Sequence, residues 1–264
     1  MTKLQKRILS LKLKMLRFFP KKIYTIQIKI KNFVRSFRFR NDSLGDIGVI
    51  KQIFINEDYD IFNMVQGKKL IEYHKEKSKN LPSLIIDAGA NIGASSVYFS
   101  SAYVNSFIFA IEPEIKNFKL LSFNTLGLNI FNFHGAIDNT DRELILEDPG
   151  LSDWGFRTKF TNKAKNKLDK IKSISPPSIL FHPSTKKTNP LILKIDIEGG
   201  EDSLFKGDVN WINNFPLIII ELHDWMLPFS GSSRNFIKAI SKLDFDFVYR
   251  GENIFLFNRK ILDN

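Results

Sequence analysis

An acidic residue and three small or polar residues follow one apolar stretch at a spacing that suits a ligand-binding loop. Residues 84–86 are Leu-Ile-Ile, the composition of a buried strand, and directly after them come Asp87, Gly89, Asn91 and Gly93. In open α/β sheets, ligands bind beyond the carboxyl ends of the strands, where glycine lets the backbone approach a ligand closely. We therefore expect a cofactor to bind at this loop.

Glu112 follows the next predicted strand, 112 − 87 = 25 positions after Asp87. In a dinucleotide-type site, an acidic residue about 20 positions after the glycine loop accepts hydrogen bonds from a ribose diol. The loop lacks the G-x-G-x-x-G pattern that binds a pyrophosphate, and the Asp87 carboxylate would repel phosphate groups. S-adenosylmethionine has a ribose and a cationic sulfonium and carries no phosphate. The pattern therefore favours this cofactor over NAD.

A second acidic motif, Leu-Lys-Ile-Asp-Ile-Glu-Gly-Gly-Glu, occupies residues 193–201. Its apolar start predicts a strand, so Asp196 and Glu198 should lie at the same edge of the sheet as Asp87. Acidic side chains at a buried strand end are costly unless they bind something, whereas Glu201 is explained by the dipole of the helix that it opens. We expect Asp196 and Glu198 to orient or deprotonate a substrate.

Glu221 and His223 should share one face at the end of a further predicted strand, because strand side chains alternate with a period of two. A histidine at such a place can act as a base near neutral pH. Together with Asp196, these two side chains could also form a divalent-metal site by geometry. The sequence does not require a metal, and we predict none. The candidate catalytic residues are Asp196, Glu198 and His223.

Strands and helices alternate from residue 84 onward, which predicts an α/β fold with a doubly wound, mostly parallel sheet. The expected strands are 84–88, 107–111, 131–136, 191–195 and 217–222. The expected helices are 93–103, 114–126, 201–206 and 233–243. Two apolar segments, 245–249 and 254–257, flank Gly251 and predict an antiparallel hairpin that closes the sheet.

A long segment, residues 138–190, separates the third and fourth of these strands. Residues 143–146 and 154–160 suit a hairpin, and the Lys- and Pro-rich remainder suits a surface loop. Long loops at the ligand edge of a sheet usually carry substrate contacts. We therefore expect this insertion to face the substrate.

Charge is concentrated at the start of the chain. The first 40 residues carry 13 Lys or Arg and no Asp or Glu, whereas the remaining 26 basic and 28 acidic residues nearly cancel. A basic amphipathic helix that ends at Pro20 is predicted by the helical spacing of Leu4, Ile8, Leu11 and Met15. Such a helix could lie on an anionic bilayer or dock on the protein's own core.

Two weaker patterns follow this helix. Isoleucines at 26, 28 and 30 alternate with polar residues and predict an exposed strand, and residues 42–48 form a turn-rich boundary. We therefore expect a basic N-terminal extension at 1–41 and a single cofactor-binding domain at 42–264.

Composition excludes several classes of protein. The absence of cysteine excludes disulfides, Cys-ligated zinc and thiol nucleophiles. No apolar run reaches the ~18 residues of a membrane-spanning helix. The many phenylalanines are not interleaved with basic residues on a defined sheet face, so we do not expect nucleic-acid binding. The expected location is the cytoplasm, with residues 1–40 able to contact the inner membrane surface.

With these motifs in hand, the chain resembles the FkbM-type family of S-adenosylmethionine-dependent methyltransferases. The resemblance spans residues 42–258, with Gly200 in place of the alanine usual there. It is carried by Ile-Asp-Ala-Gly-Ala-Asn-Ile-Gly at 86–93, by Ile-Glu-Pro at 111–113 with Asn124 and Asn129, by the acidic motif at 193–201 with Gly207, and by Ile-Glu-Leu-His at 220–223.

The resemblance implies a class I methyltransferase (Rossmann-like) fold and O-methylation of hydroxyls on a sugar, a glycan or a related small molecule. It also implies that residues 87–93 line the methionine end of the cofactor, that Glu112 holds the ribose, and that residues 136–138 flank the adenine. The expected cofactor-binding residues are thus Asp87, Gly89, Ala90, Asn91, Gly93, Glu112, Ala136, Ile137 and Asp138.

Two other functions remain open from the sequence. One is an NAD-dependent oxidoreductase on a related sheet, which the missing phosphate-binding glycines disfavour. The other is a non-catalytic protein that binds a membrane or nucleic acid through its basic extension and keeps a vestigial cofactor fold.

Overall fold

A computed structural model describes residues 1–16, 22–30, 33–147, 157–159 and 170–263 of the chain. The inner parallel strands of its central sheet are apolar and almost entirely buried on both faces, as their composition predicts. In spatial order the seven strands are β12 (Phe245–Arg250), β13 (Asn253–Asn258), β11 (Leu217–Glu221), β10 (Asn189–Ile195), β3 (Ser83–Ala88), β4 (Ser106–Glu112) and β5 (Ile130–His134).

The sheet is parallel from β5 to β11, and β13 runs antiparallel to both β11 and β12. The chain starts the sheet at β3, in the middle, and winds first to β5 and then back across to β11. The expected α/β fold is therefore confirmed, both in its doubly wound, mostly parallel sheet and in its C-terminal antiparallel hairpin.

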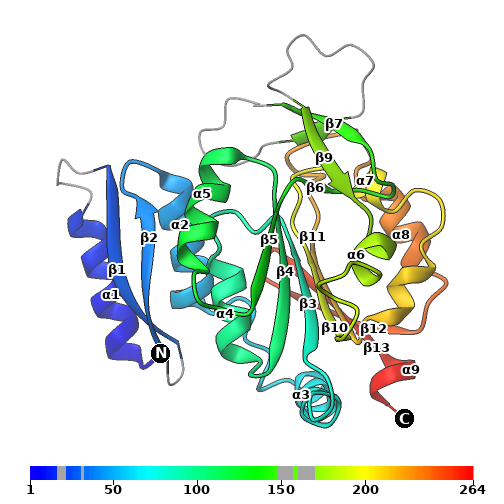
Figure 1. Ribbon diagram of the computed structural model, residues 1–264, viewed down its shortest axis with the longest axis horizontal. Coiled ribbons are helices and arrows are strands. Elements are labelled where there is room, and N and C mark those ends of the chain that lie inside the picture. The colour runs from blue at the N-terminus through cyan, green and yellow to red at the C-terminus, as the bar shows by residue number, and fades with distance from the viewer. Residues whose placement is uncertain (17–21, 31–32, 148–156, 160–169, 264) are drawn as a thin grey trace.

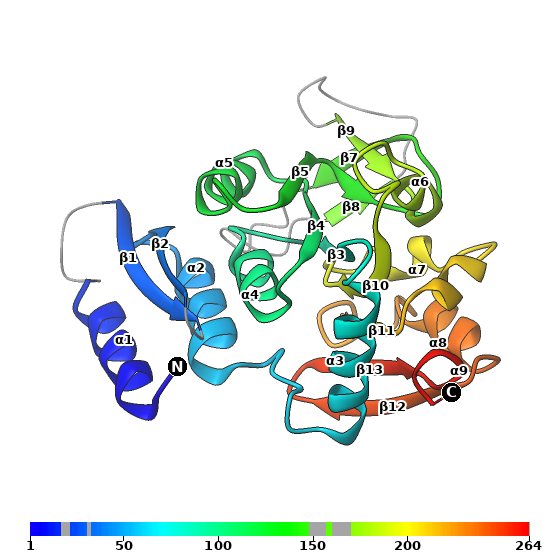
Figure 2. The same ribbon diagram turned by 60° about the horizontal axis from the view of Figure 1, so that its bottom comes forward.

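Alternate residues of the strands enter two separate hydrophobic clusters, one on each face of the sheet. Ile85 and Ile108 belong to one cluster, and their neighbours Ile86 and Phe109 belong to the other. Helices on the first face are α3 (Val65–Lys77), α4 (Ala94–Ala102) and α5 (Ile115–Asn124). Helices on the second face are α6 (Pro176–Leu180), α7 (Glu201–Leu204), η3 (Asn210–Asn214) and α8 (Arg234–Ile240) (Figures 1 and 2). A last turn, α9 (Arg259–Leu262), follows β13.

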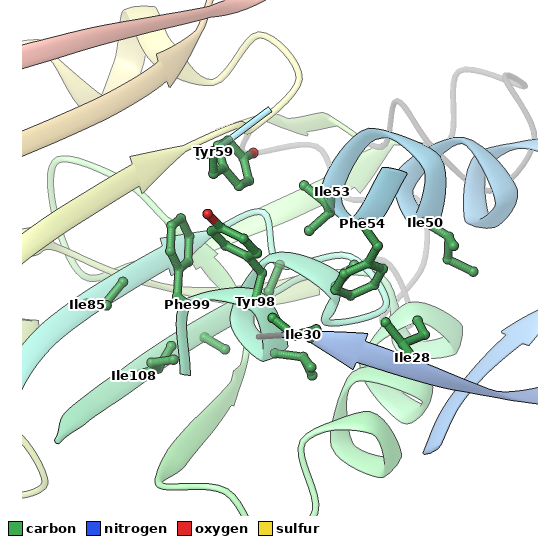
Figure 3. Close-up of a cluster of buried hydrophobic side chains, with 14 of the residues drawn as sticks. Ile28, Ile30, Ile50, Ile53, Phe54, Tyr59, Ile85, Tyr98, Phe99 and Ile108 are labelled. Carbon is green, nitrogen blue, oxygen red and sulfur yellow. The ribbon is translucent and has the colours of Figure 1, made fainter. Parts of the chain in front are cut away.

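The N-terminal region forms an outer layer on the first face (Figure 1). It consists of α1 (Lys3–Leu16), the antiparallel pair β1 (Ile23–Ile30) and β2 (Phe33–Arg40), α2 (Leu44–Ile50) and the π-helical turn η1 (Lys51–Asn56). Ile28 and Phe54 of this layer belong to the same buried cluster as Phe99 of α4, with Tyr98 and Ile30 lying between them (Figure 3). None of the helices within the described ranges is long and apolar enough to cross a membrane.

Two expectations for this layer were wrong. The strand at 26–30 is not exposed, because its isoleucines pack into the cluster while the residues between them face outward. The boundary at 42–48 is the start of a helix, since the Ser43 side chain accepts a hydrogen bond from the Asp46 backbone and caps α2. Residues 17–21, which include the expected helix end at Pro20, lie outside the described residues.

The segment between β5 and β10 forms a small second sheet above the carboxyl edge of the first (Figure 1). Its strands, in spatial order, are β6 (Ala136–Ile137), β9 (Lys170–Ile174), β7 (Glu143–Glu147) and β8 (Arg157–Lys159). The pairing of β7 with β8 is antiparallel, as expected; residues 154–156 and 160 of that predicted hairpin lie outside the described residues.

The prediction of a surface loop in the second half of this segment was wrong for the described residues from 170 onward. β9 pairs with both β6 and β7, and α6 buries Ile179 completely. The Ser-Pro-Pro at 175–177 is a helix start, because Ser175 caps α6 and proline is tolerated in the first turn.

Candidate functional site

The glycine loop after β3 and the acidic motif after β10 lie side by side at the carboxyl edge of the sheet. β3 and β10 are neighbours in parallel register, and the Asp196 backbone nitrogen donates a hydrogen bond to the Ala88 carbonyl oxygen at 3.1 Å. β4 ends on the other side of β3 and brings Glu112 to the same edge. The two motifs that the sequence suggested for cofactor and substrate thus form one site.

A cleft of about 780 Å³, including the space at its mouth, opens at this edge. Of the expected site residues, those that line the cleft are Gly89, Ala90, Asn91, Glu112, Ala136, Ile137, Asp196 and Glu198. Those that do not line it are Asp87, Gly93, Asp138 and His223.

Glu112 is buried, and its carboxylate organises the glycine loop. Its Oε2 accepts a hydrogen bond from the Asn91 backbone nitrogen at 2.8 Å, and its Oε1 accepts one from the Glu114 backbone nitrogen at 2.9 Å. Burial raises the pKa of Glu112 to about 7, because these hydrogen bonds offset only part of the desolvation. A carboxylate oxygen can accept more than one hydrogen bond, so Glu112 retains acceptor capacity toward the cleft.

Asp87 lies behind the cleft wall and is fully buried. Its Oδ2 accepts hydrogen bonds from the hydroxyls of Ser95, at 2.6 Å, and Ser96, at 2.5 Å, both in the first turn of α4. Its Oδ1 lies 3.4 Å from the Lys194 amine. In this structure Asp87 joins β3 to α4 and β10.

Gly93 and Asp138 also hold the frame of the site. Gly93 precedes α4 with a φ of 89° and packs against Leu121. Asp138 accepts hydrogen bonds from Arg142 Nε at 2.8 Å and from the Ser203 hydroxyl at 2.7 Å. These contacts tie the second sheet to α7.

Lys194 lines the cleft and was not among the expected site residues. Its side chain is 3% exposed, donates to the Gly89 carbonyl oxygen at 2.7 Å, and lies 3.4 Å from Oδ2 of Asp196. Burial alone would lower the pKa of Lys194, but the negative charges of Asp196 and Asp87 raise it above its usual value. The signal in the sequence was a lysine inside an apolar strand, a place where an unpaired charge is costly.

His223 lies at the centre of a carboxylate cluster. Its Nδ1 is 2.8 Å from Oε1 of the fully buried Glu201, and its Nε2 is 3.6 Å from Asp196, 3.5 Å from Glu198 and 3.7 Å from Glu221. Burial lowers the pKa of His223, but Glu201, Asp196 and Glu198 outweigh this effect and raise it to about 9. This balance favours the protonated imidazole near neutral pH.

For two carboxyl groups of this cluster, the effect of burial on the pKa outweighs the opposing effect of the His223 charge. Burial, and secondarily the charge of Asp196, raises the pKa of both Glu198 and Glu221 above the usual range for a carboxyl group. Of the two, only Glu198 is on the cleft wall. Carboxyl groups with raised pKa values in a cleft are suited to proton transfer near neutral pH.

Two non-glycine residues on the cleft wall have left-handed backbone conformations. The φ angle is 49° for Asn91 and 54° for Glu198. Asparagine adopts this conformation readily, but glutamate does so at a cost of about 1 kcal/mol or more. One such residue in each motif indicates that the fold enforces the loop geometry at the cleft.

Asp196, Glu221 and His223, which the sequence offered as a possible metal site, do converge. One ligand atom from each lies within 4.8 Å of the others. One nitrogen and two carboxylate oxygens form a donor set that a divalent cation can bind. The same convergence also forms without an ion between a protonated imidazole and two carboxylates.

The N-terminal layer supplies one wall of the cleft that no sequence motif indicated. This wall comprises Val49 of α2, Gln52 and Ile53 of η1, and Tyr59, which lies just beyond η1. Tyr59 is almost fully buried, and burial raises the pKa of its hydroxyl far above the usual value, so it stays a neutral donor and acceptor. Tyr59 also stacks on Phe99 of α4, with ring centroids 5.2 Å apart.

Comparison with known proteins places these residues in a family. A profile of the methyltransferase FkbM domain matches residues 87–250, from the end of β3 to the end of β12. A curated relative is Methyltransferase 1 of Beauveria bassiana (strain ARSEF 2860), which is 24% identical over 246 residues, covering 75% of this chain and 94% of that protein.

Similar solved structures include a putative caffeoyl-CoA O-methyltransferase from Staphylococcus aureus and a methyltransferase from Geobacter sulfurreducens. The first has 11% identity and a TM-score of 0.39, with 80% of this chain and 92% of that chain covered. The second has 13% identity and a TM-score of 0.35, with 81% of this chain and 90% of that chain covered. These matches are too distant to bear on the reaction. The profile match, which spans more than half of the sequence, shows that the chain belongs to the FkbM methyltransferase family.

Proposed function

We propose that this protein transfers a methyl group from S-adenosylmethionine to a hydroxyl oxygen of a sugar, a glycan or a related small molecule. The observation that carries the proposal is the pairing of functions in one cleft. Glu112 lies at the end of β4, and Asp196 and Glu198 lie beyond the end of β10, with the glycine loop between them. In this proposal, the cleft combines a nucleoside site with a proton acceptor.

The cleft residues fit this cofactor. Glu112 has acceptor capacity for a ribose diol, and its backbone partners already fix its orientation. The apolar side chains of Ile111, Ala136 and Ile137 offer contacts for the faces of an adenine ring. The excess of carboxylates over cations around the cleft favours a positively charged ligand over an anionic one.

The chain's own residues have three tasks in this proposal. S-adenosylmethionine, when bound, supplies an electrophilic methyl group on a sulfonium ion. Glu198 accepts the proton of the acceptor hydroxyl, because its raised pKa makes it a stronger base than an ordinary carboxylate. Asp196, held between Lys194 and His223, accepts a hydrogen bond from the substrate and orients it.

Cofactor choice is tested by calorimetry with S-adenosylhomocysteine and, separately, with NAD. We expect S-adenosylhomocysteine to bind and NAD not to bind. Glu112→Ala should weaken binding at least about tenfold, because it removes a charge-assisted hydrogen bond to the ribose. Unchanged binding in this variant, or preference for NAD, would contradict the cofactor assignment.

The acceptor is tested by incubating the protein with methyl-labelled S-adenosylmethionine and fractionated cell extract. The expected product is a labelled methyl ether, identified by mass spectrometry and by its stability to base. A labelled ester, amine or thioether, or label in protein or nucleic acid, would overturn O-methylation of a sugar or small molecule while leaving the cofactor assignment intact.

A further inference from the structure

The outward face of α1 carries an apolar stripe that no residue in the described ranges covers. Its four side chains are all more than half exposed: Leu4 at 66%, Ile8 at 54%, Leu11 at 52% and Met15 at 63%. The spacing of four, three and four residues puts them in one line along the helix. On the opposite face, Leu9 and Leu13 are buried in the cluster that joins α1 to the rest of the protein. The helix is thus anchored on one side and apolar on the other.

Basic side chains border this stripe on both sides. At about 100° per residue, Arg7 and Lys14 lie along one border and Lys12 along the other. All three are exposed, and within the described part of the chain none of them has an ion-pair or hydrogen-bond partner. Lys6, which points elsewhere, does pair, with Glu57 at 2.8 Å. The stripe is therefore framed by cations whose charge is available to a partner.

We propose that α1 docks this protein on the surface of an anionic lipid bilayer, with the stripe among the acyl chains and the bordering cations at the lipid phosphates. Charge complementarity selects this partner. Apolar side chains at the level of the acyl chains and basic side chains at the level of the headgroups are the arrangement that an interfacial helix needs. A second copy of α1 would bring like charges together, and a nucleic acid would leave the stripe in water.

Docking through α1 would also set the orientation of the cleft. α1 packs against η1, and η1 supplies Gln52 and Ile53 to the cleft wall. Because Leu9 and Leu13 fix α1 to this layer, the cleft would be held at a constant height above the lipid surface. The docking itself does not depend on the proposed reaction.

The test is cosedimentation of the full-length protein with vesicles. One set contains phosphatidylcholine with phosphatidylglycerol, and the other contains phosphatidylcholine alone. We expect strong binding to the anionic set and weak binding to the neutral set. Arg7→Gln with Lys12→Gln should weaken anionic binding by roughly 25-fold, about fivefold for each charge near the surface.

A second variant, with its own control, tests the contribution of the apolar stripe. Leu4→Gln with Leu11→Gln should weaken binding at least about tenfold, because two leucines no longer enter the bilayer. Val104→Gln with Leu126→Gln removes two apolar side chains elsewhere that are also more than half exposed, and it should leave binding unchanged. Matching thermal melts would show that all variants are folded.

Several outcomes would overturn the proposal. These are equal vesicle binding by the α1 variants and the parent, tighter binding to an oligonucleotide than to anionic vesicles, or dimerisation in analytical ultracentrifugation that the Leu4 and Leu11 changes abolish. Vesicle binding needs neither cofactor nor acceptor, so a failure here is distinct from a failure of the methyl-transfer proposal.

Discussion

Gly89 and Asp196 touch through their backbones, so that the glycine loop and the acidic motif form one wall. A Cβ atom on Gly89 would lie 1.7 Å from the Asp196 carbonyl oxygen, and the φ angle of Gly89 is +77°. Any side chain at this position would therefore push β3 and β10 apart at the edge where the cleft opens. The close approach explains why this position needs glycine before any ligand is considered.

Gly89→Ala is accordingly expected to be among the most damaging substitutions in the chain. Gly127→Ala is a matched control, because Gly127 has a similar φ of +75° but no atom within 4 Å of the added Cβ. The control should cost about 1 kcal/mol of unfolding free energy from backbone strain alone. Gly89→Ala should cost several kcal/mol more or prevent S-adenosylhomocysteine binding, as measured by urea unfolding and calorimetry. An equal loss of unfolding free energy in both variants would show that β3 and β10 separate easily at this edge and would contradict the prediction.

Glu112 should make cofactor affinity depend on pH near neutrality. Its pKa is raised to about 7 in the folded protein, so it loses its charge as the pH falls through that value. If the ribose diol requires the carboxylate, S-adenosylhomocysteine should bind about tenfold more weakly at pH 6 than at pH 8. Glu112→Gln should bind weakly at both pH values, and a parent protein with a flat profile would contradict this role.

The same raised pKa has a consequence for stability. Above pH 4.5, the ordinary pKa of a glutamate side chain, the folded state still binds a proton at Glu112 that the unfolded state has released. The stabilising effect of that proton is complete below pH 4.5 and is lost as the pH rises to about 7. The unfolding free energy of the parent should therefore fall as the pH rises through this range, and Glu112→Gln should lack this contribution. A thermal-melt series across this range compares the two proteins.

Glu198→Gln should lower turnover without affecting the cofactor. Removal of a general base typically costs about 100-fold or more in kcat, and the amide keeps the size of the side chain. Binding of S-adenosylhomocysteine should stay within about threefold of the parent, since Glu198 is not expected to contact the ribose. Glu76→Gln, at an exposed carboxylate on α3 paired with Lys79 and away from the cleft, is the control and should retain full turnover. Full turnover of Glu198→Gln would exclude this residue as the base.

His223 should act by setting the pKa of its carboxylate neighbours. The positive charge of His223 lowers the pKa of Glu198, so its removal should raise that pKa further. The acidic limb of the pH–rate profile should then move to higher pH in His223→Gln, with turnover recovered at alkaline pH. A purely structural role would lower turnover at every pH and leave the limb in place. A pH–rate profile of both proteins separates the two cases.

Sequence patterns predicted correctly which strand ends meet at one edge of the sheet. The strand ends with Asp87, Glu112 and Asp196 all reach one edge, because parallel strands with apolar runs leave little freedom in register. The fold class followed from the same runs. The helix at 176–180 was missed because a proline pair reads equally as a loop and as the first turn of a helix.

Sequence patterns could not predict the contacts between segments that are distant in the chain. Tyr59 and Gln52 carry no local motif. Gln52 reaches the cleft on η1, which packs against α4, and Tyr59, just beyond η1, stacks on Phe99 of the same helix. The burial of Asp87 behind the wall depends on Ser95 and Ser96 in the next helix, which are ordinary helix residues in the sequence. Tertiary packing decides such placements.

Lys194 should be essential to the stability of the site rather than only to its chemistry. Lys194→Met keeps the volume of the side chain but leaves the carboxylate of Asp87 buried without its cation, and breaking a buried pair in this way typically costs about 3–5 kcal/mol. Adding Asp87→Asn should recover part of that loss, because the uncompensated charge is then gone. Lys206→Met, at an exposed position, should change the unfolding free energy by less than about 0.5 kcal/mol. Urea unfolding of the four proteins would contradict this view if Lys194→Met were as stable as Lys206→Met.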